Sequence, residues 1–564
     1  MTESPSPTDL AAPQARELPH GSGAAPRWPH LAVLAVVLAV ALFSRTLRAG
    51  EGLPYLHRWG EPNIGSRSLD ILRNGDLNPH WFRYGSPTLY LHAGVDVACY
   101  VWLCSQPEDS RHSIRSLDEL ETMADTKWLW TLSHPTFFHW NRLATYVIGA
   151  GTVLLTYLLG RMWLGPWAAT AAAAVVTGAA AHIEVSTTIR SDMPGSLLAL
   201  GTILAALAAR ESRRPGTFLF ALFLAGLASS TKYNLVVVLV VPLAALFASL
   251  VLDARPDRTS DSQRRPWTAG PWFWFGALLM PAAGFLSGTP FALFDLATFL
   301  RDAGAEVTHY KLTGQGTRTI EPGLVHAWSQ LRQFGENASW IAIALAAPGL
   351  AVLLRKRSGW LMLVFPVVYF LFMTRTTVDF HHNFVALYPF LAILAASGVQ
   401  WLYTQLVRTE RRLGAGFALL IAGLAGAHVA PGVIEGWQTY RTPETRTRAV
   451  GLVNELAADD DWERIGISKE LRMHRIDLAE LEVEHVVKPL AELLQNSTLD
   501  AIVCATAYKA RQLESDKQQA QVARMNKLTP DAGLVGSVEG GELFLHVRSM
   551  NPGVSIFARG TGAE

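Results

Sequence analysis

The sequence predicts an all-α polytopic membrane protein with a small C-terminal extracytoplasmic α/β domain. Of its 564 residues 50% are hydrophobic and 17% are charged, whereas a soluble protein of this length would carry about 25% charged residues. The hydrophobic residues form runs, beginning at residues 31–43 and recurring as far as Ala430. Each run approaches the roughly 20 residues that a helix needs to cross a bilayer. The net charge of +1 argues against nucleic acid as a partner.

About eleven hydrophobic segments are expected to span the membrane. Many are rich in alanine and glycine, which allows close helix–helix packing in lipid. The expected spans are residues 31–49, 140–161, 166–184, 194–210, 216–230, 232–252, 271–290, 337–354, 359–374, 384–405 and 412–431.

Basic residues set the expected orientation, because positively charged loops stay in the cytoplasm. Five basic clusters follow every second span and so fall on one face, which makes the N-terminus cytoplasmic and the C-terminal domain extracytoplasmic. The clusters are Arg161; Arg210, Arg213 and Arg214; Arg255, Arg258, Arg264 and Arg265; Arg355, Lys356 and Arg357; and Arg408, Arg411 and Arg412.

One further apolar stretch, residues 86–104, would reverse the orientation of every later cluster if it crossed the membrane. It contains Asp96, and we expect it to lie along or dip into the outer surface. The long first outer loop is then residues 50–139.

Three regions are expected: a disordered cytoplasmic tail (1–28), the transmembrane domain (29–431) and a soluble extracytoplasmic domain (432–564). Short apolar runs alternate with polar helical stretches in the last region, which is typical of an α/β domain. Strands are expected at 464–468, 483–487, 499–505 and 543–547, helices at 489–495 and 508–526, and a hairpin turn at Gly540-Gly541.

Two carboxylates lie at the outer edge of the predicted bundle. Glu61 follows the first span and Asp192 precedes the fourth. Ionisable groups beside apolar helices are costly to keep, so both are candidates for a functional site. Glu61 could instead be a solvated loop acid, and Asp192 could cap the helix that begins at Met193-Pro194.

Several short motifs occur in a defined order along the chain. The first outer loop reads Trp59-Gly60-Glu61-Pro62-Asn63, then Gly75-Asp76-Leu77-Asn78-Pro79 and Arg83-Tyr84-Gly85-Ser86-Pro87. Later come Asn141-Arg142-Leu143, Arg190-Ser191-Asp192-Met193-Pro194, Ser230-Thr231-Lys232-Tyr233-Asn234, Gly288-Thr289-Pro290-Phe291 and Leu387-Tyr388-Pro389-Phe390. Over about residues 30–405 this pattern resembles the phospholipid-carrier-dependent glycosyltransferases of the GT-C fold. That group includes the protein O-mannosyltransferases of glycosyltransferase family 39 and the lipid A aminoarabinose transferases.

The resemblance implies a membrane enzyme that moves a hexosyl or pentosyl sugar from a polyprenyl-phosphate donor to an extracytoplasmic protein, lipid or glycan acceptor. A carboxylate, Glu61 or Asp192, would act as general base. Cations would stabilise the departing phosphate. The residues expected to bind donor or substrate are Arg83, Tyr84, Arg190, Lys232, Tyr233, His309, Tyr310, Arg375 and His381. For Lys232 the alternative is a side chain that snorkels at the membrane boundary, and for His381 a solvated loop histidine.

The chain departs from the family at two positions. The family has an acidic Asp-Glu pair, and here Gly60 replaces the aspartate, which usually acts as the base. Either the longer Glu61 side chain takes that role, or Asp192 does, or activity is altered. Ser86 stands where the aminoarabinose transferases have lysine, so phosphate binding would fall to arginine or lysine residues elsewhere.

Two other functions remain open from the sequence: a transporter or flippase, and a catalytically altered relative. A transporter usually has repeated halves and ionisable or Gly/Pro-broken segments near mid-membrane. No repeated halves are found, and the acidic candidates lie at helix ends, which favours the enzyme. No cofactor is expected; family members differ in metal use, which leaves a divalent metal open. The expected location is the plasma (inner) membrane of a bacterial cell envelope, in contact with membrane lipids.

Overall fold

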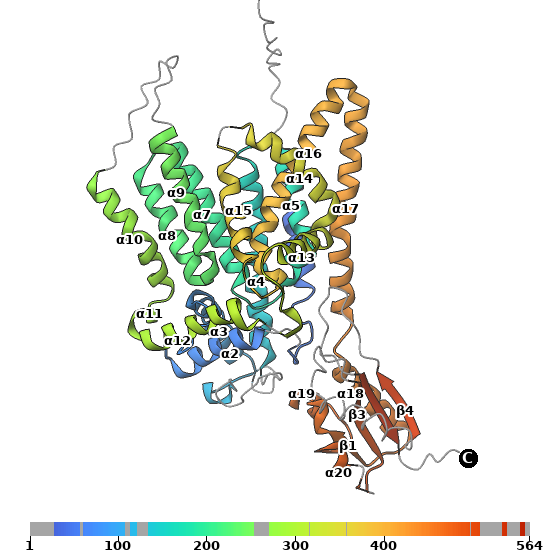
Figure 1. Cartoon of the computed structure of the whole chain (residues 1–564). Helices are drawn as coiled ribbons and strands as arrows, with labels where there is room; N and C mark the ends of the chain where they lie inside the picture. Colours follow the sequence, from blue (N-terminus) through green and yellow to red (C-terminus); the bar gives the residue numbers. More distant parts are fainter. Residues whose placement is uncertain are drawn as a thin grey trace, which may run out of the picture.

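The computed structural model describes residues 28–56, 60–107, 113–120, 134–252, 270–314, 316–356, 358–493, 495–496, 498–507, 533–538 and 553–558. Most of these residues form a helical bundle, and a smaller unit with a β-sheet lies beyond one end of it (Figure 1). We call that end of the bundle the sheet-side end. The predicted fold class, a helical multi-pass membrane protein with a small C-terminal α/β region, is confirmed.

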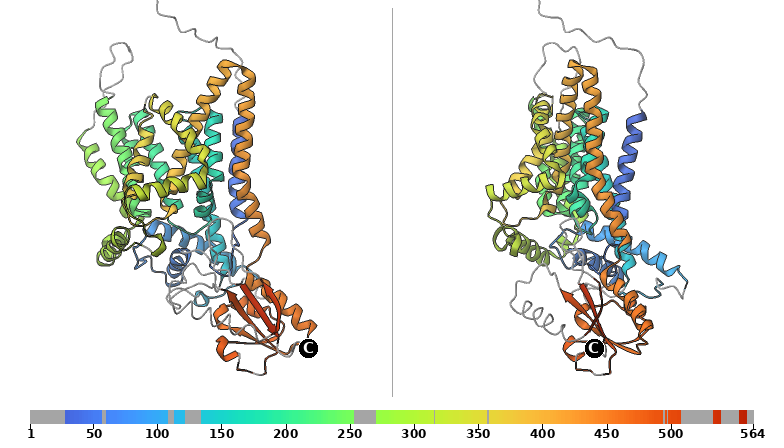
Figure 2. Two further views of the ribbon diagram at one scale, coloured as in Figure 1. Left: turned by 45° about the vertical axis from the view of Figure 1, so that its right-hand side comes forward. Right: turned by 90° about the vertical axis from the view of Figure 1, so that its right-hand side faces the viewer.

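The bundle consists of helices that run mostly between its two ends (Figures 1 and 2). They are α1 (Trp28–Thr46), α4 (Pro135–Gly160), α5 (Pro166–Gly178), α6 (Ala180–Ser186), α7 (Asp192–Ser212), α8 (Pro215–Thr231), α9 (Val240–Phe247), α10 (Pro271–Gly288), α14 (Trp340–Leu354), α15 (Leu361–Met373), α16 (Tyr388–Thr409) and α17 (Arg411–Arg441).

Among the described residues, seven helical segments are long and apolar enough to cross a membrane. There are eight if α5 and α6, which meet at a 66° bend, form one span. The remaining three predicted spans correspond to α8 and α15, with 17 and 13 residues, and to α10, which contains Pro281. All eleven predicted segments therefore coincide with helices, but these three fall short of the length or hydropathy of a full span.

Glycines allow the closest contacts between bundle helices. A Cβ on Gly226 of α8 would lie 2.0 Å from the carbonyl oxygen of Pro281 in α10. A Cβ on Gly349 of α14 would lie 1.9 Å from the carbonyl oxygen of Leu394 in α16. No side chain fits at either position, which explains why the sequence places small residues within its apolar segments.

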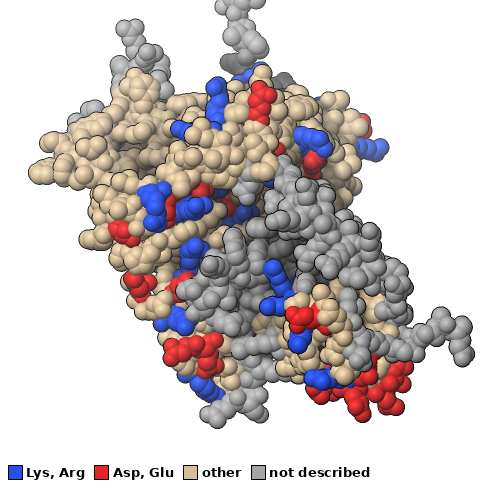
Figure 3. Space-filling view, turned by 60° about the horizontal axis from the view of Figure 1, so that its bottom comes forward, with Lys and Arg blue, Asp and Glu red and all other residues tan. Residues whose placement is uncertain are grey.

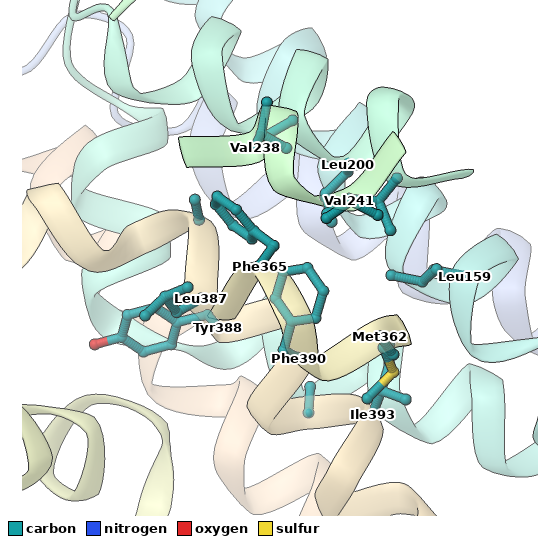
Figure 4. Close-up of a cluster of buried hydrophobic side chains, with 14 of the residues drawn as sticks. Leu159, Leu200, Val238, Val241, Met362, Phe365, Leu387, Tyr388, Phe390 and Ile393 are labelled. Atoms are coloured by element: carbon teal, nitrogen blue, oxygen red, sulfur yellow. The ribbon is translucent and has the colours of Figure 1, made fainter. Parts of the chain in front are cut away.

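Aromatic and branched aliphatic side chains fill the middle of the bundle (Figure 4). Phe365 of α15 packs on Phe390 of α16, with ring centroids 5.7 Å apart. Val238 and Leu200 belong to the same buried cluster. These contacts fix α7, α15 and α16 against one another and so position the ends from which the polar residues described below project.

Shorter helices lie across the sheet-side end. They are α2 (Glu61–Asn74), α3 (Ser86–Cys104), α11 (Phe291–Phe294) and α12 (Leu296–Thr308). α13 (Leu324–Phe334) lies level with the middle of the bundle in Figure 1 and belongs with α14 to one candidate span. Figure 1 shows α2 and α3 crossing this end, and α3 is not among the seven candidate spans. This arrangement agrees with the prediction that residues 86–104 form a surface helix.

The smaller unit follows α17. Its helices are α18 (Thr445–Asp459), α19 (Arg475–Ala479) and α20 (Leu490–Leu493), and its strands are β1 (Arg464–Ser468), β2 (Glu484–Lys488), β3 (Ala501–Ala507), β4 (Gly533–Val538) and β5 (Gly553–Ala558). The sheet has the order β2-β1-β3-β5-β4. The β2-β1-β3 part is parallel, and β5 and β4 pair antiparallel.

The first three predicted strands match β1, β2 and β3 closely, and α20 lies within the helix predicted at 489–495. The predictions for residues 508–526, 540–541 and 543–547 lie outside the described residues, as does the predicted N-terminal tail except for Trp28. The strands β4 and β5 were not predicted from the sequence.

Candidate functional site

Glu61 is fully buried in an ion pair with Arg142 of α4. Its Oε1 accepts from Arg142 Nε at 3.0 Å, and its Oε2 accepts from Nη2 at 2.7 Å. The backbone N–H of Ile189 donates to the same Oε1 at 3.2 Å. Arg142 also donates to the carbonyl oxygens of Ala49 and Glu51, at 3.1 and 2.7 Å. The pair therefore ties the end of the first span to α2, α4 and the segment before α7.

The start of α2 explains why Glu61 points inward. Gly60 adopts φ +104°, a conformation that side chains disfavour, and Pro62 suits the first helical turn. A Cβ on Gly60 would lie 3.4 Å from Nε and Nη2 of Arg190. The position where the family carries an aspartate therefore faces the Arg190 guanidinium.

Asp192 lies in a second polar cluster, which we call the Asp192 cluster: Arg190, Asp192, Lys232, Tyr310 and Asn383. Lys232 Nζ donates to Asp192 Oδ1 and, at 2.8 Å, to Asn383 Oδ1. Tyr310 Oη donates to the same amide oxygen at 3.2 Å. Arg190 Nε lies 3.8 Å from Asp192 Oδ2.

The Asp192 cluster forms where four segments end at the sheet-side end of the bundle. Asp192 begins α7, and Lys232 directly follows α8. Asn383 belongs to a 3₁₀ segment (His381–Leu387) before α16, and Tyr310 to a π-helical turn (His309–Thr313) after α12. Residues separated by up to 193 positions thus meet at one end of the bundle. No local sequence pattern reports a contact over such a separation.

Glu306 of α12 adds a second carboxylate in electrostatic range of this cluster. Burial raises the pKa of Glu306, although Arg83 and Lys232 act to lower it. Burial, reinforced by Glu306, raises the pKa of the Tyr84 phenol to about 12. Tyr84 is therefore a neutral hydrogen-bond donor at physiological pH, and Arg83 is exposed beside it.

The histidine and arginine candidates of the later outer loop differ in placement. His381 Nε2 lies 2.9 Å from Glu184 Oε2, so it faces a carboxylate on α6. Arg375 is exposed, and in the part of the chain that the structure describes no hydrogen bond or ion pair joins it to the Asp192 cluster. The structure thus places His381 beside Glu184 and leaves Arg375 apart from the Asp192 cluster.

Two aromatic candidates flank the cluster. Tyr233 Oη donates to the carbonyl oxygen of Phe82 at 2.7 Å, which ties the end of α8 to the loop before α3. The rings of His309 and Tyr310 meet edge to face, with centroids 5.5 Å apart. Of this pair, Tyr310 belongs to the Asp192 cluster through its hydrogen bond to Asn383, and His309 lies beside it.

Three residues at the site were missed as candidates from the sequence: Arg142, Asn383 and Glu306. Glu306 is four positions after Asp302, so both carboxylates share one face of a helix, which was a usable signal. Arg142 is a charged residue within a predicted span, another usable signal. Asn383 carried no signal, because its role depends on the approach of α8.

No group of three or more His, Cys, Asp and Glu side chains arranged to hold a metal ion occurs among the described residues. The side chains at this end of the molecule are nevertheless strongly polar. Figure 3 views the sheet-side end and shows basic and acidic side chains interspersed on it, below a bundle surface that is mainly uncharged.

Comparison with known proteins supports the resemblance found in the motifs. The family model for dolichyl-phosphate-mannose-protein mannosyltransferases matches residues 139–280. This stretch contains Arg142, Arg190, Asp192 and Lys232. The match supports the predicted class, a membrane glycosyltransferase of the GT-C group. No curated protein matches the sequence.

Several solved structures are similar to this chain. ArnT from Cupriavidus metallidurans bound to undecaprenyl phosphate is 13% identical, with 93% of this chain and 97% of that chain covered and a TM-score of 0.48. The Archaeoglobus fulgidus oligosaccharyltransferase is 12% identical, with coverage of 85% and 70% and a TM-score of 0.48. The S. cerevisiae Pmt1–Pmt2 complex bound to the sugar donor is 17% identical, with coverage of 52% and 36% and a TM-score of 0.31.

Proposed function

We propose that this protein transfers a sugar from a polyprenyl-phosphate donor to an acceptor hydroxyl on the sheet-side face, with Asp192 as general base. The observation that carries the proposal is the Asp192 cluster, in which a carboxylate and two basic side chains converge at the sheet-side end of the bundle. The family match to enzymes named for a dolichyl-phosphate-mannose donor supports a lipid-linked donor.

The sheet-side face is proposed to be extracytoplasmic. The connection between α16 and α17 lies at the opposite end of the bundle (Figure 1), and it is flanked by Arg408 of α16 and by Arg411 and Arg412 of α17. Basic connections favour the cytoplasm. A lipid-carried donor suits this arrangement, because nucleotide sugars are absent outside the membrane, and the location follows as the plasma membrane.

The proposed reaction moves one proton and one glycosyl group. Asp192 takes the proton of the acceptor hydroxyl, and the acceptor oxygen forms a bond to the anomeric carbon. The bond from that carbon to the phosphate oxygen breaks, and polyprenyl phosphate leaves with the bonding electrons. General-base assistance of this kind contributes about 10²–10⁴-fold to a rate.

Cations near Asp192 fit the departing phosphate. Arg190 and Lys232 lie within the cluster, and Arg83 acts electrostatically on the nearby Glu306. α7 also begins here, and the N-terminus of a helix favours negative charge. Positioned cations of this kind stabilise the charge that develops on a leaving group.

The contacts of the two candidate carboxylates favour Asp192 over Glu61 as base. Both oxygens of Glu61 are held by Arg142, and its side chain is 0% exposed, so an acceptor hydroxyl has no access to it. The Asp192 side chain is 5% exposed, and its Oδ2 lies 3.8 Å from Arg190 rather than in a short hydrogen bond. We assign Glu61 a positioning role.

The experiment is transfer of radiolabelled sugar by the purified protein in lipid nanodiscs. Synthetic polyprenyl-phosphate sugars with different hexoses and pentoses serve as donors, and released polyprenyl phosphate is quantified with the glycosylated product. Wild type is expected to release one polyprenyl phosphate per sugar transferred. Asp192→Asn is expected to bind the donor and transfer little.

Asp500→Asn is the matched control, because this carboxylate accepts hydrogen bonds in the smaller unit, from the backbone of Glu463 and Arg464. It should transfer at the wild-type rate. Translocation of intact donor across a proteoliposome membrane, with no release of polyprenyl phosphate, would instead establish the flippase alternative. Donor binding without transfer or translocation by wild type would favour the catalytically altered relative.

A further inference from the structure

Tyr55 lies shortly after the first span and is buried against the smaller C-terminal unit. Its hydroxyl donates to Asp477 Oδ2 and accepts from the backbone N–H of His474 at 2.8 Å. The guanidinium of Arg446 lies 3.5 Å from the centroid of the Tyr55 ring. Arg446 is itself held by Glu444, with Nε donating at 2.8 Å.

This junction satisfies every polar group that it buries. Tyr55 is 1% exposed and Asp477 is 2% exposed. Burial, followed by the neighbouring Asp477, raises the pKa of the Tyr55 phenol, so the hydroxyl keeps its proton as a donor. Thr447 Oγ1 donates to Asp477 as well, at 3.4 Å. A buried acceptor left without its donor destabilises the folded state by more than the net free energy of the hydrogen bond. The junction is therefore stable only when Tyr55 and Asp477 are paired.

A continuous chain of described contacts leads from Tyr55 to the candidate active site. The turn before Tyr55 contains Ala49 and Glu51, whose carbonyl oxygens accept from Arg142. Arg142 holds Glu61, and Glu61 accepts from the N–H of Ile189. Ile189 immediately precedes Arg190 of the Asp192 cluster.

We infer that Tyr55 is a positioning residue through which the C-terminal unit holds the Arg142–Glu61 pair, and with it Arg190, in the geometry that transfer requires. The inference rests on the proposed function for its effect on turnover. The mechanical link is independent of that function, because it consists of hydrogen bonds between described residues.

The first arm of the test measures the coupling between Tyr55 and the segment before α7, and it does not depend on sugar transfer. Hydrogen–deuterium exchange is followed by mass spectrometry for wild type, Tyr55→Phe and Asp477→Asn in nanodiscs. Tyr55→Phe removes only the hydroxyl, whereas Asp477→Asn keeps an acceptor oxygen. We expect faster exchange in peptides covering residues 49–56 and 184–193 for Tyr55→Phe, and a smaller change for Asp477→Asn. Unchanged exchange at 184–193 in both variants overturns the inference.

The second arm measures transfer. A displacement of the catalytic groups lowers kcat steeply while leaving much of the donor binding, so Tyr55→Phe is expected to lower kcat about tenfold, with a donor KM within about twofold of wild type. Tyr440→Phe is the matched control, because that phenol is 66% exposed on α17. A loss of thermal stability with an unchanged kcat would show a purely structural contact and overturn the inference.

The two arms separate this inference from the proposed function. Wild type that transfers no sugar contradicts the proposed function, and the exchange arm still decides the link. If the C-terminal unit unfolds in Tyr55→Phe, peptides covering β1 will also exchange faster. In that case Asp477→Asn decides the outcome, provided that its β1 peptides remain protected. Exchange at 184–193 at the wild-type rate would contradict the link, and faster exchange there would support it.

Discussion

The Glu61 region and the Asp192 region differ in what surrounds the carboxylate, although both lie at the same end of the bundle. Glu61 is held through both oxygens by Arg142 and is fully buried. Asp192 contacts Lys232 and Arg190, Lys232 also donates to Asn383, and the Asp192 side chain is 5% exposed. A two-point guanidinium pair fixes a carboxylate as a support, whereas a carboxylate among separate, partly open contacts remains available to a substrate.

The comparison also bears on Gly60. The Arg190 guanidinium faces the site where a Cβ of residue 60 would be, and it also lies near Asp192. A carboxylate from α7 thus reaches the same cation that an aspartate at position 60 would face. In our proposal Asp192 therefore acts as the general base in place of an aspartate at position 60.

The largest expected effect is that of Asp192→Asn on turnover. The amide cannot accept the acceptor proton, so kcat should fall by about 10²–10⁴-fold, with donor affinity largely kept because Lys232 still bonds to Asn383. Single-turnover transfer and equilibrium donor binding provide the measurements. A kcat within about threefold of wild type would exclude Asp192 as the base.

Arg142→Ala should have the largest effect on stability. It leaves the buried Glu61 carboxylate without its cation, and removal of one partner of a buried ion pair costs roughly 3–5 kcal/mol. Thermal unfolding in nanodiscs should show a clearly lower Tm. The double variant Glu61→Gln/Arg142→Ala should recover part of that loss, since no unpaired charge remains. A double variant less stable than Arg142→Ala would contradict this account of the pair.

Tyr310→Phe should have a moderate effect confined to the Asp192 cluster. It removes the hydroxyl that donates to Asn383, a hydrogen bond worth about 1 kcal/mol, so kcat/KM should fall about fivefold. Tyr403→Phe, on an exposed phenol, is the control. Equal kinetics for Tyr310→Phe and wild type would place Tyr310 outside the reaction.

The smallest expected effect is a pH-dependent difference in stability for Glu306→Gln. Burial raises the pKa of Glu306 above its ordinary 4.5 in the folded protein. The folded state therefore binds this proton more tightly, and the resulting stability is complete below pH 4.5 and declines as the pH rises through the folded pKa. Glutamine stays neutral, so the variant should match wild type at about pH 4 and exceed its Tm at about pH 8. A variant Tm that falls below wild type at about pH 8 would contradict the burial effect.

Much of the fold could be predicted from the sequence, because membrane helices and short strands leave local patterns. The apolar runs located every bundle helix, and the alternation of apolar and polar stretches located β1. The hydrophobic pattern alone did not distinguish α8, α10 and α15 from the longer spans. Pro281 is visible in the sequence, but the continuation of α10 through it and the shortness of α15 depend on packing, since neighbouring helices compensate for such interruptions.

The candidate site was predicted in part. Asp192, Lys232 and Arg190 were selected from their positions at span ends, and the structure brings them together. The pairing of Glu61 with Arg142 depends on tertiary packing across 81 positions, and no local pattern reports it. The different exposure of the Glu61 and Asp192 side chains also results from tertiary packing.

The central claim, that Asp192 serves the chemistry and Glu61 the support, is tested most directly by two isosteric variants studied side by side. Glu61→Gln and Asp192→Asn are purified in nanodiscs, and kcat for sugar transfer and Tm are measured on the same samples. We predict that Asp192→Asn loses about 10²–10⁴-fold in kcat per folded molecule, with the smaller loss of Tm because Lys232 remains bonded to Asn383. Glu61→Gln should show the larger loss of Tm and only about a tenfold loss of kcat per folded molecule, as expected when the position of Arg190 is disturbed. The reverse pattern, with kcat lost in a fully stable Glu61→Gln and retained in Asp192→Asn, would contradict the account.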